Sequence, residues 1–435
     1  MKNEFSIRSI LTIIAYILYI HIYLKIKYFH TINTKHKIRW LEQNKIIHSD
    51  QTLRLSGIFS GKENINVYID DELIDVFQNH KKFEAVVDLG LMDCGWHKIT
   101  ATINDEETSL YIHKISNKEG VIVNEYTVEL ATEQKQKIIP NYYKYIVDKY
   151  NPRYRYFYNS IDDDTTYQTA IKDENGIILL PKPFSIWQKY YYNPVTIAQT
   201  ALKLYGSGSF TNDNENKRYF LKYADWFVEK SVGGAYKYDI LWFCGPTLLF
   251  PKWVSGMAQG QALSVLSRAY TLTKDKKYLD AGFKALTFLS QPVDTGGCTC
   301  CLNHFASLSS SLSHMMKSKI VEEYPTDNPP LVLNGNLFAL IGLYDWSIIS
   351  TEEYGRTLAT SLFKEGCQSI AALLPYYDYY TYSSYSLSQW ICDIPPCFDS
   401  PYAHDCHIFL LHTLYEITGI KIFEEYYKRF LSYIS

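Results

Sequence analysis

Short runs of alternating hydrophobic and polar residues begin at about residue 50. They include Asn66–Ile69, Phe83–Leu89, His97–Ile103 and Ser109–His113, with turn residues such as Gly95 between them. Alternation of this kind is typical of antiparallel strands with one buried face. The pattern predicts a small sandwich-like β-domain over residues 50–118, in which no side chain has an evident catalytic role.

From Asn193 onwards the hydrophobic positions recur at helical spacing. A helix over residues 257–272 is followed by Lys274-Asp275 and a second helix over 277–289, which predicts an antiparallel hairpin. Recurring hairpins with small-residue faces are typical of an α/α toroid, whose loops line a groove at one end. We therefore expect an α+β chain in which an antiparallel β-domain precedes a toroid domain over residues 191–435.

Two segments lie outside these domains. Residues 9–24 are apolar and uncharged between basic flanks, which favours an uncleaved membrane anchor within residues 1–30, with a packed amphipathic first helix as the alternative. The basic residues that follow this segment outnumber those before it, which favours the cytoplasmic side for the rest of the chain. Residues 119–190 form a Tyr-rich connecting segment. In it Arg153 and Arg155 are candidates to pair with acid groups of a sugar, with solvated charges on a half-buried strand as the alternative.

Charge and composition exclude several classes of protein. Lys and Arg number 43 against 46 Asp and Glu, a net charge of -3 that argues against a nucleic-acid partner. The 39 tyrosines suit a sugar-binding cleft, although an AT-rich genome would also enrich tyrosine. The chain has nine cysteines, an odd number, which argues against a disulfide framework. No two pairs of cysteines are each separated by two residues, the spacing typical of a zinc site.

A carboxylate lies next to a phenol at Glu323-Tyr324, on a loop that precedes a predicted helix. Such a pair can abstract and return a proton when burial tunes the two pKa values. Adjacent Glu and Tyr are also common on protein surfaces, so the pair alone does not define a site.

The wider sequence around this pair carries a resemblance. Its segments are Tyr191–Pro194, Trp253–Ala262, Glu323–Pro325, Leu333–Gly335, Leu340–Asp345, Ala371–Asp378 and His404–Ile408. Together they resemble the C-terminal domain of the D-glucuronyl C5-epimerases, which convert glucuronate to iduronate in heparan sulfate precursors. The resemblance covers about residues 190 to 435 and does not extend to the first 120 residues.

The resemblance implies a function and a set of site residues. A base removes the C5 proton of a glucuronate in a heparosan-like polysaccharide, and an acid on the opposite ring face returns a proton, with no redox cofactor. The expected catalytic residues are Glu323, Tyr324, Tyr385 and Tyr402. The expected substrate-binding residues are Tyr192, Trp253, Gln259, Asn334, His404 and His407, joined by Arg153 and Arg155 from the connecting segment.

This sequence departs from the family pattern at two places. Ser388 and Gln389 stand where the family has Arg and His, and Ala403 directly precedes the His pair where the family has Tyr, with Tyr402 one residue earlier. Loss of a carboxylate-binding Arg and a proton-transfer Tyr would weaken transition-state stabilisation. Arg153, Arg155 or Arg268 could replace the missing cation in space. Two other functions stay open, namely a uronate polysaccharide lyase and a catalytically impaired glycan-binding homologue.

The expected partners are an anionic uronate-containing polysaccharide and a membrane, and a homodimer is left open. With a single-pass anchor, the resemblance implies the Golgi lumen in a eukaryote, and the cytoplasmic face of the membrane is the alternative in a bacterium. His404 and His407 have a spacing that could hold a structural divalent cation, but the family pattern supplies the same pair, which favours a role in packing or in the groove. No catalytic metal is expected.

Overall fold

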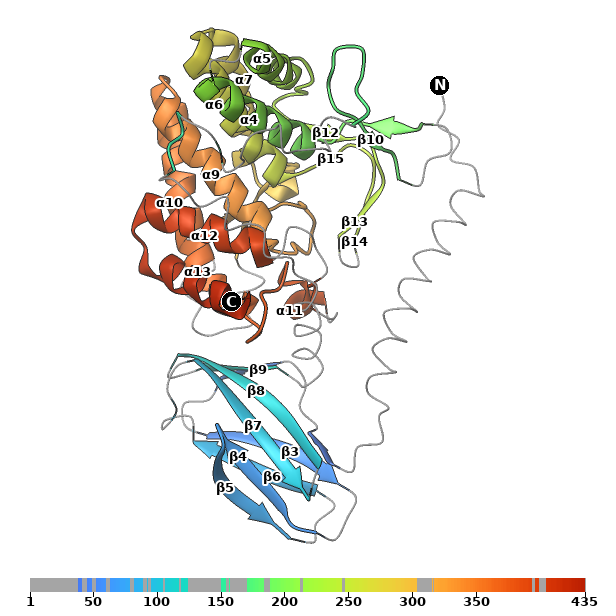
Figure 1. The fold of residues 1–435 in the computed structure, drawn as a ribbon, viewed down its shortest axis with the longest axis vertical. Helices are drawn as coiled ribbons and strands as arrows, with labels where there is room; N and C mark the ends of the chain where they lie inside the picture. Colours follow the sequence, from blue (N-terminus) through green and yellow to red (C-terminus); the bar gives the residue numbers. More distant parts are fainter. Residues whose placement is uncertain are drawn as a thin grey trace. The chain divides into compact units, whose positions relative to one another are not determined.

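The computed structural model describes residues 38–40, 45–48, 52–59, 63–78, 82–88, 92, 95–104, 106–116, 119–123, 150–153, 156, 170–183, 188–211, 214–244, 247–302, 315, 317–392, 396–398 and 404–434. The chain divides into two compact units, Met1–Leu130 and Ala131–Ser435 (Figure 1). The predicted anchor within residues 1–30, Arg155 and Tyr402 lie outside the described residues. Among the helices that are described, none combines the length and the apolar character needed to cross a bilayer.

The N-terminal unit consists of antiparallel strands in two sheets. One sheet has the order β1-β3-β6 and the other has the order β2-β9-β8-β7-β4-β5. The strands are β1 (Ile38–Trp40), β2 (Lys45–His48), β3 (Thr52–Phe59), β4 (Ile65–Ile69), β5 (Glu72–Phe77), β6 (Lys82–Asp88), β7 (Gly95–Ile103), β8 (Glu106–Ser116) and β9 (Glu119–Val123). They extend beyond the predicted range of 50–118 at both ends.

The two sheets share one hydrophobic core. In β6 the residues alternate between exposed and buried, so that Phe83, Ala85 and Val87 face inward. They pack with Leu55 of the same sheet and with Ile99 of the other sheet in a single cluster. Sheets that bury one face each against a common core form a sandwich, and the two antiparallel sheets of this unit have that arrangement.

The C-terminal unit is mainly helical. Its helices are α4 (Pro194–Thr211), α5 (Asn214–Glu229), α6 (Gly256–Thr273), α7 (Lys276–Ser290), α9 (Leu333–Ile349), α10 (Glu353–Tyr377), α11 (Ser388–Cys392), α12 (His404–Thr418) and α13 (Lys421–Ile434). Its short strands are β10 (Leu180–Pro181), β11 (Tyr190–Tyr191), β12 (Lys237–Tyr238), β13 (Trp242–Cys244), β14 (Thr247–Leu249), β15 (Trp253–Val254), β16 (Thr299–Cys301) and β17 (Lys319–Val321). The chain is therefore a mixed helix and strand protein.

The helices follow one another as hairpins. Lys274 ends α6 in the left-handed conformation, and the Asp275 side chain accepts a hydrogen bond from the Lys277 amide at the start of α7. This cap places α6 and α7 side by side, as the sequence predicts (Figure 1). In the same way Glu352 caps the start of α10 after α9, with its carboxylate on the amides of the first turn.

Two glycines allow the central helices α6 and α9 to pack closely. A Cβ atom added at Gly342 would lie 1.9 Å from the Gly260 carbonyl oxygen, and one added at Gly260 would lie 2.4 Å from the Ala339 Cα. No larger residue fits either position without moving a backbone. Because both helices are covered on nearly all sides, their polar residues are forced into the interior, where each requires a partner.

Candidate functional site

The loop that carries Glu322, Glu323 and Tyr324 lies against the start of α6. It continues strand β17, and the Glu322 amide donates to the Cys298 carbonyl at 2.6 Å. The Gly256 amide donates to the Glu322 carbonyl at 3.0 Å, where a Cβ on Gly256 would come within 2.2 Å of that oxygen. This close contact fixes the loop at the N-terminal end of α6.

The Glu323 side chain points to the start of α9 and is only 6% exposed. A Cβ atom added at Gly335 would lie 2.2 Å from Glu323 Oε2. The carboxylate therefore fits only because Gly335 has no side chain. Burial raises the pKa of Glu323 to about 7, while hydrogen bonds from Tyr324 and Tyr385 act in the opposite direction. A carboxyl group with this pKa changes charge near neutral pH, which suits a general base.

Two tyrosines extend from this carboxylate. The Tyr385 hydroxyl donates to Glu323 Oε1 at 3.5 Å, and the Tyr324 and Tyr385 hydroxyls are 3.4 Å apart. Burial, followed by the nearby Glu323 charge, raises the pKa of both phenols well above the ordinary value. Both phenols are therefore protonated at neutral pH and can act as acids or relay a proton.

The backbone of Tyr385 is held on both sides. Its amide donates to the Cys397 carbonyl at 2.7 Å, and its carbonyl accepts from the amide of Leu333, the first residue of α9, at 3.0 Å. The start of α9 thus fixes both Tyr385 and, through Gly335, the carboxylate of Glu323.

An aromatic wall borders the Glu323–Tyr324–Tyr385 cluster. The Trp253 ring of β15 stacks on Tyr238 of β12 with centroids 3.9 Å apart, and its centroid lies 5.7 Å from that of Tyr324. Cys244 of β13 is close enough to both site phenols to raise their pKa. Trp253 is among the residues expected from the sequence, whereas Tyr238 and Cys244 are not. Their strands have only two and three residues, too few to show a strand pattern in the sequence.

Tyr192 and Gln259 have other partners. The Tyr192 hydroxyl donates to Asp173 Oδ2 at 2.7 Å. Gln259 is fully buried, with its Oε1 on the Tyr236 amide and its Nε2 on the Gly234 carbonyl, both at 2.8 Å. These contacts hold the loop before β12, so Gln259 positions that loop and does not present its amide at a surface.

Asn334 is the second residue of α9 and is also fully buried. Its Nδ2 atom lies 3.9 Å from the Met257 sulfur, and its Oδ1 atom has no hydrogen-bond partner within the described part of the chain. Asn334 thus directly precedes Gly335, which contacts Glu323, and its Oδ1 atom could still accept a hydrogen bond.

The two histidines of α12 hold a loop in place. His404 Nδ1 accepts from the Ser383 amide at 3.0 Å, and its Nε2 lies 2.9 Å from the Phe430 carbonyl. A carbonyl only accepts, so His404 carries its proton on Nε2 and is neutral. Burial, followed by the neighbouring His404, lowers the pKa of His407 well below its ordinary value, and its Nδ1 bonds the Ser383 hydroxyl at 2.7 Å.

Neither histidine reaches a surface, since both are 0% exposed. Through Ser383 they fix the segment that leads to Tyr385 two residues later, which makes them positioning residues in this structure. Among the described residues no group of His, Cys, Asp and Glu has a metal-binding arrangement.

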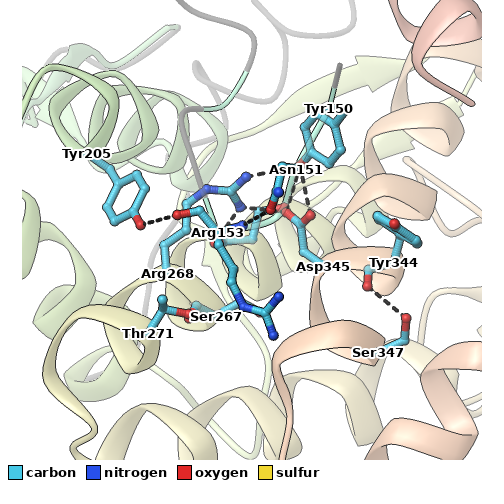
Figure 2. A network of polar contacts seen from close by, with 11 residues as sticks. Tyr150, Asn151, Arg153, Tyr205, Ser267, Arg268, Thr271, Tyr344, Asp345 and Ser347 are labelled. Carbon is cyan, nitrogen blue, oxygen red and sulfur yellow. Dashed lines mark hydrogen bonds and ion pairs between the residues drawn. The ribbon is translucent and has the colours of Figure 1, made fainter. Parts of the chain in front are cut away.

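Arg268 belongs to a buried network at the other end of α6 (Figure 2). Its guanidinium bonds Asp345 Oδ2 at 2.6 Å and the Tyr150 hydroxyl at 3.1 Å, and Tyr150 in turn donates to Asp345 Oδ1 at 2.8 Å. Arg268 and Asp345 are both 0% exposed. Twelve residues of helix separate Arg268 from Gly256, about 18 Å at the rise of an α-helix. Arg268 is thus committed to Asp345 and does not supply a cation to the Glu323 cluster.

Arg153, and the two residues that stand where the family has Arg and His, have other contacts. Arg153 is exposed, and its carbonyl accepts from the Tyr205 hydroxyl at 2.8 Å (Figure 2). Ser388 is buried with its hydroxyl on that of Ser386, and Gln389 Nε2 donates to the Tyr379 hydroxyl at 2.8 Å. Ser388 and Gln389 therefore form neutral internal contacts.

Of the predicted catalytic residues, Glu323, Tyr324 and Tyr385 come together, with Trp253 beside them. They come from three separate parts of the sequence, the β17 loop, the loop after α10 and β15. A buried carboxyl group linked through one phenol to a second phenol can remove a proton at one point and donate one at another.

Comparison with known proteins finds similar sequences for this part of the chain. Residues 232–432 match the family described as D-glucuronyl C5-epimerase C-terminus. A D-glucuronyl C5-epimerase of Caenorhabditis elegans is 31% identical over 194 residues, which cover 43% of this chain and 29% of that protein. An uncharacterized protein of Methanocaldococcus jannaschii is 30% identical over 185 residues, which cover 41% of this chain and 51% of that protein. The matches thus span about half or less of these relatives.

Solved structures give weaker matches. A family 76 glycoside hydrolase from Bacteroides thetaiotaomicron aligns with a TM-score of 0.35 at 12% identity, over 91% of this chain and 78% of that chain. A polysaccharide lyase, BACCELL_00875, aligns with a TM-score of 0.30 at 12% identity, over 91% of this chain and 47% of that chain. Scores this low carry no argument about fold or activity.

Proposed function

We propose that this protein inverts C5 of D-glucuronate to L-iduronate within a heparosan-like polysaccharide, because residues 232–432 match the family described as D-glucuronyl C5-epimerase C-terminus. The observation that carries the proposal is the chain of contacts from Glu323 through Tyr385 to Tyr324. It joins a base and an acid across one site.

The first step is removal of the C5 proton by the Glu323 carboxylate. The electron pair left on C5 spreads into the C6 carboxylate of the sugar as an enolate. With its pKa raised to about 7, Glu323 is partly ionised at neutral pH and is a stronger base than an ordinary carboxylate.

The second step is proton donation from the Tyr324 hydroxyl to the opposite face of C5, which gives iduronate and a Tyr324 phenolate. The contacts of 3.5 Å and 3.4 Å limit the distance between Glu323 Oε1 and the Tyr324 oxygen to about 7 Å. A carbon at a near-attack distance of about 3 to 3.5 Å from each of the two oxygens requires them to lie near this upper limit. We therefore expect the bound sugar to separate the Tyr324 hydroxyl from Glu323.

The third step restores the site. Protonated Glu323 gives its proton to Tyr385, which passes a proton to the Tyr324 phenolate, so that no proton is gained or lost overall. Both transfers follow the two contacts already present, and neither needs a cofactor.

The enolate receives less cationic help than the family pattern implies. Ser388 and Gln389 bond Ser386 and Tyr379, and Arg268 bonds Asp345. Removal of one preorganised donor from an active site typically slows catalysis by about 10² to 10³-fold. We therefore expect a slow epimerase, and binding of the polymer without turnover is the outcome that would identify an impaired homologue.

The arrangement of helices supports the finer fold assignment, an α/α toroid. The starts of α6 and α9 meet at one loop, since Gly256 and Gly335 contact Glu322 and Glu323 respectively. In a toroid of helix hairpins the loops at one end line the binding groove, which is where this site would lie.

Proton NMR in deuterated water tests the proposed function. The protein is incubated with heparosan and with N-sulfated heparosan, and loss of the C5 signal and appearance of iduronate are followed. Tyr324→Phe is expected to abolish both changes, while the matched control Tyr354→Phe, on the exposed start of α10, is expected to keep them. Unsaturated chain ends would indicate a lyase, and binding of both polymers without exchange would contradict the epimerase assignment.

A further inference from the structure

The hairpin β13–β14 has an exposed aromatic residue on the face that borders the site. Cys244 pairs with Thr247 and Trp242 pairs with Leu249 across the two strands. Because side chains alternate along a strand, Trp242 and Cys244 share one face, about 7 Å apart. Cys244 is 9% exposed, whereas Trp242 is 37% exposed.

Two connections place this face next to the Tyr324–Tyr385 pair. The Trp253 ring lies 5.7 Å from that of Tyr324, and its Nε1 donates to the Ile240 carbonyl at 3.1 Å, two residues before Trp242. Cys244 lies near both phenols. The hairpin therefore has a buried residue, Cys244, beside the site and an exposed indole, Trp242, two residues away on the same face.

Lysines gather beside the same hairpin. Lys182 and Lys252 lie 3.3 Å and 3.4 Å from the two oxygens of Asp239, three residues before Trp242. Lys189 is bonded through its carbonyl to the Lys182 amide, and Lys237 precedes the stacked Tyr238 and is exposed. Asp239 thus pairs with two ammonium groups, an excess of one positive charge, and the exposed Lys237 lies two residues before it.

Lys252 has an unusual backbone. Its φ angle is 86°, in the left-handed region that residues other than glycine rarely adopt. Its amide donates to the Tyr238 carbonyl at 2.7 Å, which fixes this conformation beside the Trp253–Tyr238 stack. Backbone strain of this kind is often found at ligand-binding positions.

We propose that Trp242, the two lysines that pair with Asp239 and the exposed Lys237 form a binding track for the polysaccharide beyond the sugar that reacts. A pyranose ring of a neighbouring residue would stack on the Trp242 indole, and the carboxylates or sulfates of the chain would pair with Lys237 and Lys252. This inference rests on the proposed function and adds to it a dependence on chain length and charge. Aromatic faces and ammonium groups are the chemistry that binds an acidic sugar polymer.

The experiment measures C5 exchange by the full-length protein on long heparosan chains and on a short heparosan oligosaccharide. Trp242→Ala is expected to raise KM for the long chains about fivefold to tenfold, the effect of one lost aromatic contact of about 1 kcal/mol. kcat and the KM for the short oligosaccharide are expected to change less than twofold. Trp242→Phe should restore most of the loss, and Tyr354→Ala serves as a control for loss of an exposed ring.

A second variant tests the charge. Lys237→Gln with Lys252→Gln is expected to weaken binding of long heparosan and to reduce the dependence of that binding on salt concentration, because fewer ion pairs remain to be screened. Thermal unfolding of each variant separates these effects from a failure to fold.

The outcomes distinguish this inference from the proposed function. If the unsubstituted protein exchanges C5 protons and Trp242→Ala has the same KM on long chains, the binding track is wrong and the epimerase assignment stands. If Trp242→Ala lowers kcat equally on long and short substrates, Trp242 supports the catalytic site instead, which also contradicts the track. If the unsubstituted protein exchanges no protons on either substrate, the proposed function itself fails.

Discussion

Replacement of Glu323 by glutamine is expected to remove activity and to stabilise the protein. Glutamine keeps the shape of the side chain and the acceptor for the Tyr385 hydroxyl, but it can neither ionise nor accept the C5 proton. C5 exchange should therefore fall below detection. The same change removes the cost of a charge in a pocket where the carboxylate is only 6% exposed.

The size of that cost follows from the pKa. Burial raises the Glu323 pKa from 4.5 to about 7, so the folded protein binds this proton more tightly than the unfolded chain does. Each unit of pKa corresponds to about 1.4 kcal/mol, which gives an upper value of about 3 kcal/mol. The sign is that of a raised carboxyl pKa: the penalty is absent below pH 4.5, grows as the pH rises and is complete above about pH 7.

Unfolding midpoints measured at pH 5 and pH 8 isolate this contribution. Glu323→Gln is compared with the unsubstituted protein at each pH, so that any effect of glutamine that does not depend on pH cancels. The variant should gain several degrees more at pH 8 than at pH 5. The control Glu229→Gln, at the exposed end of α5, should give the same difference at both pH values.

The catalytic side of the same prediction is a pH profile. kcat/KM for C5 exchange should fall as the pH drops below about 7, because protonated Glu323 cannot act as the base. Equal shifts of the Glu323→Gln midpoint at pH 5 and pH 8 would show that the carboxylate ionises freely. That result would refute the buried base on which the mechanism depends.

Three further substitutions test separate parts of the structure. Tyr385→Phe removes the hydroxyl between Glu323 and its acid, so the exchange rate should fall by about 10² to 10⁴-fold while heparosan binding, measured by calorimetry, is retained. Gly335→Ala would place a Cβ 2.2 Å from Glu323 Oε2, and displacement of the carboxylate should lower kcat by about 10²-fold in the same NMR assay. Asp345→Asn leaves the buried Arg268 charge unpaired, which should destabilise the protein by about 3 to 5 kcal/mol in a denaturant titration, with kcat per folded molecule unchanged.

Local signals in the sequence are sufficient to predict several parts of the structure. The helix hairpin at Lys274-Asp275 could be predicted because a turn residue and an N-cap residue lie side by side. Glu323, Tyr324 and Tyr385 could be expected to lie together because they occur in motifs that resemble those of the D-glucuronyl C5-epimerases, and their side chains do meet. In each case the information is contained in a few neighbouring residues.

The environment of other residues could not be read from the sequence. Close packing at Gly260 and Gly342 buries α6 and α9 on nearly all sides, so a polar residue such as Gln259 gives no sign of facing inward. Arg268 and Asp345 are 77 positions apart, and nothing local pairs them. These positions depend on tertiary packing, which sequence periodicity does not specify.

The short strands were missed for a related reason. β13 and β14 have three residues each, too few for an alternation pattern to stand out. Gly245-Pro246 between them is a turn signal that would have indicated a hairpin. Trp242 and Cys244 would then have been placed on one face.

The first turnover in deuterated water tests the two-group mechanism most directly. Heparosan is mixed with an excess of protein, and the deuterium content of iduronate and of unreacted glucuronate is measured before a second turnover. The account predicts iduronate that carries deuterium at C5 from the exchanged Tyr324 hydroxyl, beside glucuronate that is still unlabelled. Iduronate that retains the original proton would show that one group both removes and returns it, and would contradict the separate roles of Glu323 and Tyr324.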